Sequence, residues 1–237
     1  MAYFIILTPA TKGWLIPEDV VVSQVTATNS TGILSFSDKS GKTVLSVTRD
    51  QILGSGSFGK TYSTLDKVDG VDVVVKIMPA DEFSTHSVAM EVLTQIIVEK
   101  ETAGYNKEGL KGPFCPRLFM YGRSADSHYI LMERCASELK PIIRSNTKAA
   151  LLIGVIIGVS RILDHLWSML KFNHRDLKAD NIMVSAEGQI RLIDFGTSCL
   201  TYGPAEVSPG YGHLRKVLDN CTLPSRDLKT LFYYILM

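Results

Sequence analysis

The hydrophobic positions of this chain follow a strand period near its start and a helix period in two later stretches. Short apolar runs punctuated by Ser, Thr, Asn, Asp and Gly predict β-strands at 20–22, 32–36 and 43–47, with a hairpin turn at 37–41. We expect residues 1–48 to form a β-rich extension packed on the domain that follows. A surface for a partner or for targeting is the alternative interpretation of this extension.

Two stretches space their apolar residues by three and four, which predicts helices at 83–101 and 148–170. The second is apolar along most of its length and is expected to be a central core helix. Its longest apolar run, 149–160, is too short to cross a bilayer, so we expect a buried helix and no membrane span.

Strands are also predicted at 71–78, 116–121 and 129–135, and a polar, glycine-containing loop is predicted at 104–112. The strands gather in the first part of the chain, and the second long helix follows them. The family resemblance described below implies an α+β fold, in which this β-rich part precedes a mainly helical part.

Composition narrows the classes of function. The chain has 237 residues, of which 46% are apolar and 21% charged, as in globular proteins. A net charge of +1 gives no reason to expect nucleic-acid binding. The four cysteines form no C-x-x-C pair, which argues against a zinc knuckle or disulfide framework and favours a reducing compartment. With no secretory signal pattern at its start, we expect the chain in the cytoplasm.

Candidate chemistry is concentrated between residues 173 and 195. Asp176, Asn181 and Asp194 supply two carboxylates and an amide at spacings of five and thirteen. Two short apolar runs between Asn181 and Asp194, separated by a glycine-containing turn, predict a hairpin. A hairpin brings its ends together, so Asn181 and Asp194 should lie side by side with Asp176 one loop upstream. Such oxygen ligands suit Mg²⁺ bound together with substrate phosphates.

These residues carry a family resemblance. His174–Asn181 resembles the catalytic loop of protein kinases, and Asp194-Phe195-Gly196 resembles their metal-binding turn. Upstream, Gly54, Gly56 and Gly59 form G-x-G-x-x-G between two strand-like segments. A dinucleotide-binding fold would need a helix after the third glycine, whereas this chain continues as a strand, which favours the kinase glycine loop.

The resemblance implies a bilobal protein-kinase-like fold with extra N-terminal strands. It places a small lobe at 49–134 and a shortened, mainly helical large lobe at 135–237, after the extension at 1–48. It also implies Mg²⁺-ATP as the phosphoryl donor, with Mn²⁺ as an alternative cation, and a protein hydroxyl as the acceptor.

Catalytic roles follow from the same resemblance. Asp176 would accept or orient the proton of the substrate hydroxyl, and Lys178 would stabilise the transferring phosphoryl group. A lysine at this place goes with serine/threonine specificity in the family. Asn181 and Asp194 would hold the metal.

The phosphate-binding lysine implied by the resemblance is Lys76, which follows the glycine loop by seventeen residues. Its helix partner would be Glu91, with Glu99 as the alternative. The chain departs from the family in having Val74 and Thr61 where the family usually has alanine and valine. The bulk of Val74 on the nucleotide roof is expected to weaken ATP affinity.

The resemblance implies an ATP-binding set drawn from the glycine loop, the roof, the gatekeeper position and the hinge. These residues are Gly54, Ser55, Gly56, Ser57, Phe58, Gly59, Thr61, Val74, Lys76, Met132, Glu133, Cys135 and Met183.

Downstream of Gly196 the resemblance weakens. No Ala-Pro-Glu motif ends the activation segment, and the last helices of the large lobe are missing. Asp227 would brace the backbone of the catalytic loop. In these respects the chain looks like the minimal kinases of large DNA viruses or bacterial effectors, which would place it in a host cytoplasm. Activation-segment hydroxyls that a phosphate could modify are Thr197, Ser198, Thr201, Tyr202 and Ser208.

Three functions are compatible with these residues. An active serine/threonine kinase is favoured by the intact set of catalytic residues. A catalytically weak kinase-like scaffold, acting by binding a partner protein that replaces the missing helices, is the main alternative. A small-molecule phosphotransferase is disfavoured by Lys178, because related families usually lack that lysine.

Overall fold

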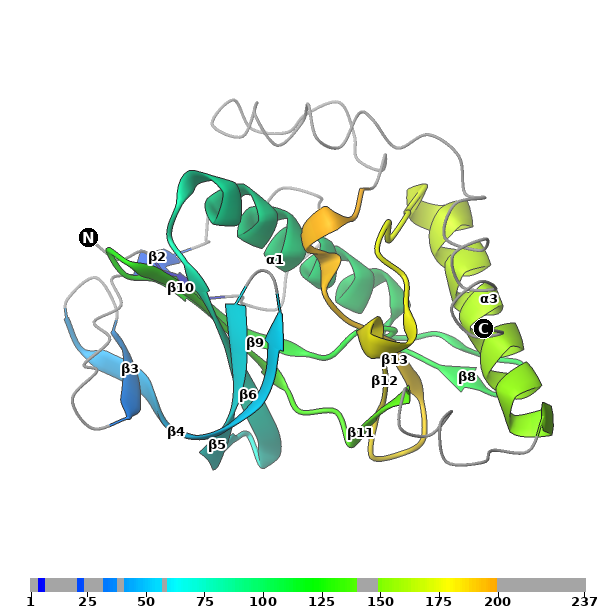
Figure 1. Cartoon of the computed structure of the whole chain (residues 1–237), viewed down its shortest axis with the longest axis horizontal. Helices are drawn as coiled ribbons and strands as arrows, with labels where there is room; N and C mark the ends of the chain where they lie inside the picture. The colour runs from blue at the N-terminus through cyan, green and yellow to red at the C-terminus, as the bar shows by residue number, and fades with distance from the viewer. Residues whose placement is uncertain are drawn as a thin grey trace. The chain divides into compact units, whose positions relative to one another are not determined.

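The computed structural model describes residues 4–6, 21–23, 32–37, 41–56, 59–139 and 149–199 (Figure 1). The chain divides into two compact units. The first unit contains Met1–Val92 and Arg117–Arg134, and the second contains Leu93–Pro116 and Cys135–Met237. The expectations for Asp227 and for the missing Ala-Pro-Glu motif lie outside the described residues.

The first unit is built on one eight-stranded sheet in which every neighbouring pair is antiparallel. In spatial order its strands are β2 (Val21–Ser23), β1 (Phe4–Ile6), β9 (Leu118–Arg123), β10 (Ser127–Glu133), β6 (Val71–Pro79), β5 (Gly59–Val68), β4 (Thr43–Gly56) and β3 (Ile33–Ser37).

One face of this sheet carries the hydrophobic core of the first unit. Val73 and Val75 of β6 are buried there together with Leu34 and Phe36 of β3 and Val47 of β4. Because strand side chains alternate between faces, Val74 and the other even-numbered residues of β6 point to the opposite face. The strands that precede residue 49 therefore supply part of the core rather than a separate layer.

Two features of this sheet differ from the sequence-based prediction. No strand is predicted at Phe4–Ile6, yet β1 pairs with both β2 and β9. A three-residue run has no local period to read, and its partner β9 lies more than a hundred residues away. In addition, β4 is one strand of 14 residues that crosses the predicted boundary between residues 48 and 49.

Helix α1 (Glu82–Thr102) begins in the first unit and continues into the second. The second unit also contains α3 (Ala149–Leu170), a small three-stranded sheet, a two-stranded hairpin and two short 3-10 helices. The smaller elements are β7 (Asn106–Lys107), β8 (Leu110–Lys111), β11 (Ser137–Glu138), η1 (Ala179–Asn181), β12 (Ile182–Val184), β13 (Ile190–Leu192) and η2 (Phe195–Thr197).

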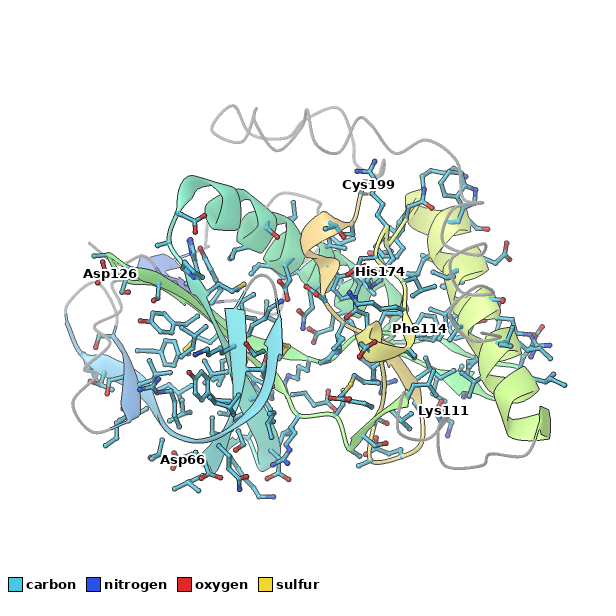
Figure 2. All side chains as sticks on the ribbon, viewed as in Figure 1. Asp66, Lys111, Phe114, Asp126, His174 and Cys199 are labelled. Carbon is cyan, nitrogen blue, oxygen red and sulfur yellow. The ribbon has the colours of Figure 1, made fainter. Side chains whose placement is uncertain are left out.

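The loop predicted at 104–112 contains the β7–β8 hairpin. Two residues per strand are too few to show a period of two, so the hydrophobic pattern predicts no strand there. The hairpin follows the end of α1, and the buried Phe114 comes shortly after it (Figure 2).

Helix α3 is buried along one face, which includes Val159, Ile162 and Leu166. Its amino-terminal half differs from the predicted core helix, because Ile153 is 55% exposed and Ile157 is 45% exposed. Within the described residues, only the part of α3 from Ile153 to Leu170 is long and apolar enough to cross a membrane by length and composition. This is weak support for a span, since a core helix passes the same test.

Candidate active site

The predicted hairpin between Asn181 and Asp194 is confirmed. Strands β12 and β13 pair antiparallel, with Ile182 opposite Leu192. The Ile193 amide donates to the Asn181 carbonyl over 3.1 Å, so the pairing continues to the end of the hairpin. Asn181 and Asp194 therefore leave the hairpin side by side, as the sequence predicts.

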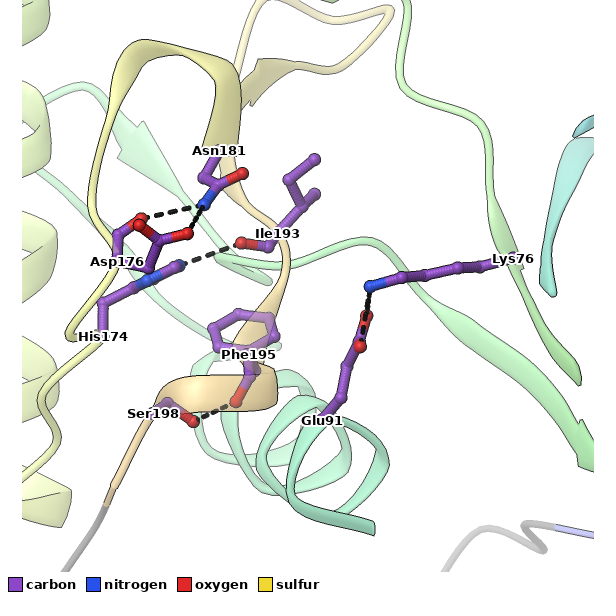
Figure 3. Close-up of polar contacts among 8 residues, drawn as sticks. All are labelled: Lys76, Glu91, His174, Asp176, Asn181, Ile193, Phe195 and Ser198. Atoms are coloured by element: carbon purple, nitrogen blue, oxygen red, sulfur yellow. Dashed lines mark hydrogen bonds and ion pairs between the residues drawn. The ribbon is translucent and has the colours of Figure 1, made fainter. Parts of the chain in front are cut away.

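Asp176 is held by two side chains of its own loop, Lys178 and Asn181, of which Figure 3 shows Asn181. The Lys178 ammonium donates to Asp176 Oδ2 over 2.7 Å. The Asn181 amide nitrogen donates to the same oxygen over 3.0 Å and to the Asp176 backbone carbonyl over 2.8 Å. Both amide hydrogens of Asn181 are thus used, which leaves its oxygen Oδ1 as the atom that can bind a cation.

Lys178 lies in a negative environment. Partial burial alone would lower its pKa, but the hydrogen bond to Asp176 and the charges of Asp176, Asp194 and Asp180 outweigh that effect and raise the pKa above its ordinary value. Lys178 is therefore a permanent cation at neutral pH, next to the carboxylate that the sequence assigns to proton transfer.

The backbone adopts left-handed conformations at two functional positions. Arg175 has φ of 67° and Asp194 has φ of 64°, although neither residue is a glycine. Such residues cost about 1–3 kcal/mol each and persist only where surrounding contacts hold them. One such contact is the hydrogen bond of 2.9 Å between His174 Nε2 and the Ile193 carbonyl, which ties the catalytic loop to the residue before Asp194.

Phe195 packs the turn that begins at Asp194 against the loop that contains His174. Its ring is fully buried. The centroid of this ring lies 5.4 Å from that of His174 and 5.9 Å from that of Phe172. Ser198 extends this contact, because its hydroxyl lies 2.6 Å from the Phe195 carbonyl oxygen and 3.2 Å from the hydroxyl of Thr94 on α1. Sequence reasoning missed Phe172, Thr94 and Ser198 as supports of the site, because none belongs to a catalytic motif.

A backbone bridge closes the base of the site. Asn173 and Cys199 exchange two hydrogen bonds of 2.9 Å each. Cys199 is also disulfide-bonded, whereas Cys115 and Cys135 carry free thiols. The sequence argues only against a disulfide framework and did not indicate this bond, since spacing along a chain does not report which thiols the fold brings together.

Lys76 and Glu91 form a buried ion pair in the first unit. The Lys76 ammonium lies 2.7 Å from both carboxylate oxygens of Glu91 (Figure 3). Their side chains are 12% and 2% exposed. The structure thus pairs Lys76 with Glu91 rather than with Glu99, two helical turns further along α1. The role of this pair in holding phosphates remains a prediction.

Four of the predicted nucleotide-binding residues share one face of the sheet. Thr61 of β5 lies opposite Lys76 of β6, and Met132 of β10 lies opposite Val74. Residues directly opposite each other on antiparallel strands project to the same side, as do residues two apart on one strand. These four side chains therefore form a continuous surface on the face away from the core.

The glycine loop joins β4 to β5. Gly54 pairs with Thr61, and Gly56 pairs with Gly59. Gly59 has φ of 152°, and a Cβ atom there would lie 2.2 Å from the Ile77 carbonyl oxygen. This position therefore needs glycine for steric reasons. The neighbouring Ser55 is exposed, and Ser57 and Phe58 lie outside the described residues.

The predicted hinge residues begin at the end of β10. Glu133 makes two hydrogen bonds with the backbone of Arg117. The Glu133 amide donates to the Arg117 carbonyl over 2.9 Å, and the Glu133 carboxylate accepts from the Arg117 amide over 3.1 Å. Met132 and Cys135 are buried. Met183 lies on β12, opposite Glu138 and Arg191. Their contact with adenine remains a prediction.

The donor set suits a hard cation that keeps other ligands. No group of three or more His, Cys, Asp or Glu side chains that could hold a metal occurs among the described residues. Asn181 offers an amide oxygen and Asp194 a carboxylate, which fits Mg²⁺ completed by phosphates and water. A softer metal such as zinc would need nitrogen or sulfur ligands.

Two activation-segment hydroxyls fall within the described residues. Thr197 is exposed, whereas Ser198 is 2% exposed and engaged in the contacts described above. A phosphate on Ser198 would have to break those contacts. Thr201, Tyr202 and Ser208 lie outside the described residues.

Comparison with known proteins gives the class. A model of the protein kinase domain matches residues 47–214. Serine/threonine-protein kinase 10 from Danio rerio is 34% identical over 155 residues, which cover 62% of this chain and 14% of that protein. Serine/threonine-protein kinase pakG from Dictyostelium discoideum is 27% identical over 152 residues, which cover 63% of this chain and 12% of that protein.

Calcium-dependent protein kinase 5 from Oryza sativa subsp. japonica is 31% identical over 203 residues, which cover 78% of this chain and 34% of that protein. The matched part of the chain thus spans between 12% and 34% of the length of these relatives. The fold and the family match define a protein kinase domain. The chain belongs to the eukaryotic-type serine/threonine protein kinase family.

Proposed function

We propose that this chain is an active serine/threonine protein kinase that transfers the γ-phosphoryl group of Mg²⁺-ATP to a protein hydroxyl. The observation that carries the proposal is the arrangement around Asp176. Lys178 and Asn181 both donate to Oδ2. The other oxygen, Oδ1, accepts no hydrogen bond within the described part of the chain. A carboxylate oxygen of fixed direction is thereby left for a substrate hydroxyl.

Asp176 orients the hydroxyl of the acceptor and accepts its proton at Oδ1. Two donors hold Oδ2 in place, so Oδ1 is the oxygen that is directed at an incoming hydroxyl. Lys178 brings a permanent positive charge within 2.7 Å of this group. That charge is placed to offset negative charge on the transferring phosphoryl oxygens.

Metal binding in this proposal falls to Asn181 and Asp194. The amide of Asn181 is turned by its two bonds to Asp176, so that its oxygen faces away from the loop. The carboxylate of the metal site comes from Asp194, whose left-handed backbone conformation is supported by the hydrogen bond between His174 and the Ile193 carbonyl. Asn181 and Asp194 would hold Mg²⁺, which when bound would supply positive charge that offsets the charge of the phosphates.

Nucleotide binding in this proposal falls to the sheet face that carries Thr61, Val74, Lys76 and Met132. Glu91 fixes the Lys76 ammonium through two bonds of 2.7 Å, which directs the lysine for pairing with phosphates. Val74 and Met132 give the adenine an apolar surface. Val74 is 7% exposed, and its extra bulk compared with alanine is expected to weaken ATP affinity.

The decisive experiment is transfer of labelled γ-phosphate to a generic protein substrate by wild type, Asp176→Ala and Asp176→Asn. Mass spectrometry of the chain itself detects autophosphorylation. Wild type should exceed Asp176→Ala by about 10³-fold or more, since proton transfer and orientation are both lost. If wild type only matches Asp176→Ala, the proposal is wrong and a scaffold is favoured. Transfer to small molecules but not to proteins would favour the small-molecule phosphotransferase.

Asn181→Ala tests the metal assignment separately. This variant loses the amide oxygen and both bonds to Asp176, so the Mg²⁺ concentration for half-maximal rate should rise at least about tenfold. Thr197→Ala is a control on an exposed neighbour and should leave the Mg²⁺ dependence unchanged. An unchanged Mg²⁺ dependence in Asn181→Ala would remove Asn181 from the metal site.

The setting of this activity is also a proposal. The substrate is a protein, and the regulatory partner expected from the sequence would bind the large lobe. A cytoplasmic location is carried over from the sequence, and the disulfide at Cys199 is the observation that argues against it. Alkylation of the purified chain before and after reduction would report how much of Cys199 is oxidised.

A further inference from the structure

Strand β4 belongs to the hydrophobic core at one end and to the glycine loop at the other. Near its start, Val47 lies in the core cluster of the first unit, and Leu45 packs against that cluster. Near its end, Gly54 and Gly56 pair with β5 and form the stem of the glycine loop. Figure 1 shows β4 as one long, curved strand between these ends. The segment between them therefore sets the direction in which the glycine loop leaves the sheet.

The pairing of β4 with β5 shifts twice within this segment. Strand β4 covers the five steps from Arg49 to Gly54 while β5 covers the three steps from Thr64 to Thr61, so β4 holds two more residues than its partner. Extra residues of this kind form β-bulges, which bend a strand and increase its local twist. The bend of β4 thus lies directly ahead of the glycine loop.

The hydroxyl of Ser63 joins β5 to the first of these bulges. It accepts from the Gln51 amide over 3.1 Å and donates to Asp50 Oδ2 over 3.2 Å. The Gln51 carbonyl, 3.3 Å away, is an alternative acceptor for the single hydroxyl hydrogen. Ser63 is 3% exposed, whereas Asp50 and Gln51 are exposed. One buried side chain therefore holds both residues of the bulge.

Ser63 lies on the sheet face that we propose to bind nucleotide. It pairs with Val74 of β6, and residues directly opposite each other project to the same side. Its hydroxyl is nevertheless bonded sideways to β4, and its side chain is almost fully buried. Ser63 is therefore placed to act through β4 rather than by touching a ligand.

The strand that carries Ser63 is fixed in turn to β6. The Thr64 hydroxyl lies 3.0 Å from the Val73 carbonyl oxygen and 2.9 Å from the Asp66 carbonyl oxygen, where β5 in turn holds extra residues. The carboxylate of Asp66, labelled in Figure 2, accepts a hydrogen bond from the Thr48 amide of β4. These bonds make the Ser63 hydroxyl a fixed point against which β4 bends.

We propose that Ser63 is a positioning residue for nucleotide binding, which holds the bulge of β4 and thereby fixes the direction of the glycine loop. All the residues involved belong to the first unit. Without the hydroxyl, Asp50 and Gln51 can turn to water, because both are exposed. The bend of β4 then varies, and the glycine loop is no longer held over the face that carries Lys76. The proposal rests on the proposed kinase function for its effect on ATP, but not for its effect on the glycine loop.

The test compares Ser63→Ala with Ser63→Thr in the full chain. Alanine should speed amide hydrogen exchange in residues 50–62 by about fivefold, the factor that one net hydrogen bond provides, while exchange in β6 stays as in wild type. The KM for Mg²⁺-ATP should rise about fivefold while kcat changes by less than about twofold, which marks a loss of uniform binding. Threonine keeps the hydroxyl and should restore both readouts to within about twofold of wild type.

Ser46→Ala is the matched control on the same strand. It removes a hydroxyl from the exposed bond of 3.0 Å between Ser35 and Ser46 and should change neither readout. If a folded Ser63→Ala keeps wild-type exchange in residues 50–62, or if its KM for Mg²⁺-ATP does not rise, Ser63 does not position the glycine loop for nucleotide and this inference is wrong. Should Ser63→Ala fail to fold, Asp50→Ala removes the exposed end of the same contact and must shift both readouts in the same direction.

The inference and the proposed function can fail separately. A wild type that shows no phosphotransfer contradicts the proposed function. The exchange comparison then still decides whether Ser63 holds the glycine loop, and calorimetric titration with Mg²⁺-ATP replaces KM as the measure of nucleotide binding. Equal affinity of wild type and Ser63→Ala in that titration would overturn the inference.

Discussion

Replacing Glu91 should destabilise the chain by an amount that can be estimated from its burial. Glu91 is 2% exposed and Lys76 12% exposed, and the ammonium contacts both carboxylate oxygens. Removing one partner of a buried pair leaves the other charge uncompensated, at a cost of about 3–5 kcal/mol. Because the Lys76 side chain keeps some exposure, we take the lower end, about 3 kcal/mol, for Glu91→Ala. Such a loss changes the ratio of folded to unfolded protein by about 150-fold.

The double variant Lys76→Met/Glu91→Leu makes the prediction specific to the pair. Two apolar side chains of similar size replace a buried ion pair at little or no cost, so its stability should lie within about 1 kcal/mol of wild type. The single variants Lys76→Met and Glu91→Leu should each have a lower free energy of unfolding than the double variant. The coupling between the two positions should therefore be at least about 2 kcal/mol. Phosphotransfer should be lost in both variants that carry Lys76→Met, because the double variant regains stability but not the lysine that we propose to bind phosphate.

Urea denaturation followed by circular dichroism measures these free energies of unfolding. The control is the exposed pair of Lys67 and Asp72 at 3.0 Å on the same sheet, with side chains 58% and 63% exposed. Asp72→Asn should cost no more than about 0.5 kcal/mol. If Glu91→Ala costs as little as Asp72→Asn, or if the losses of the two single variants simply add in the double variant, the buried pair is not the interaction described here.

Two further predictions concern the glycine loop and His165 of α3. Gly59→Ala should lower the free energy of unfolding by about 1–3 kcal/mol. In Gly54→Ala the added Cβ atom meets nothing within 4 Å, so the change should be less than about 1 kcal/mol. Urea denaturation measures both free energies. Burial and the charge of Lys107 lower the pKa of His165 below 6.5, against the charge of Asp164. As the pH falls, His165 is therefore protonated in the unfolded chain before it is protonated in the folded chain. The stability that is present above pH 6.5 is lost as the pH drops below that value. His165→Gln should make the denaturation midpoint less dependent on pH between pH 7.5 and about 5, and an unchanged dependence would contradict this origin.

The elements of the active site that could be predicted from sequence are those defined by local pattern. The hairpin ending at Asp194 was readable because two apolar runs flank a glycine turn. The helix carrying Glu91 was readable from its period, and α1 differs from the prediction by one residue at each end. The family resemblance then ranked Glu91 above Glu99, and the pairing with Lys76 in the structure follows that ranking.

What could not be predicted depends on contacts between distant positions. Strand β1 exists because it pairs with β9, and three residues carry no period. The β7–β8 hairpin has only two residues per strand, so its order comes from the packing of Tyr105 and Leu110 against α3 rather than from its own sequence. The hydrogen bond between Thr94 and Ser198 joins residues 104 positions apart. No local pattern marks either hydroxyl.

These distant contacts explain how the catalytic loop tolerates unfavourable backbone conformations. Left-handed Arg175 and Asp194 together cost about 2–6 kcal/mol, and local sequence offers no glycine to relieve it. The bonds that oppose this cost come from outside the loop: His174 to the Ile193 carbonyl, and the two bonds between Asn173 and Cys199. Buried packing of Phe195 adds to them. The backbone conformation of Asp194 is therefore set by the fold, which is the kind of preorganisation that the proposed phosphoryl transfer requires.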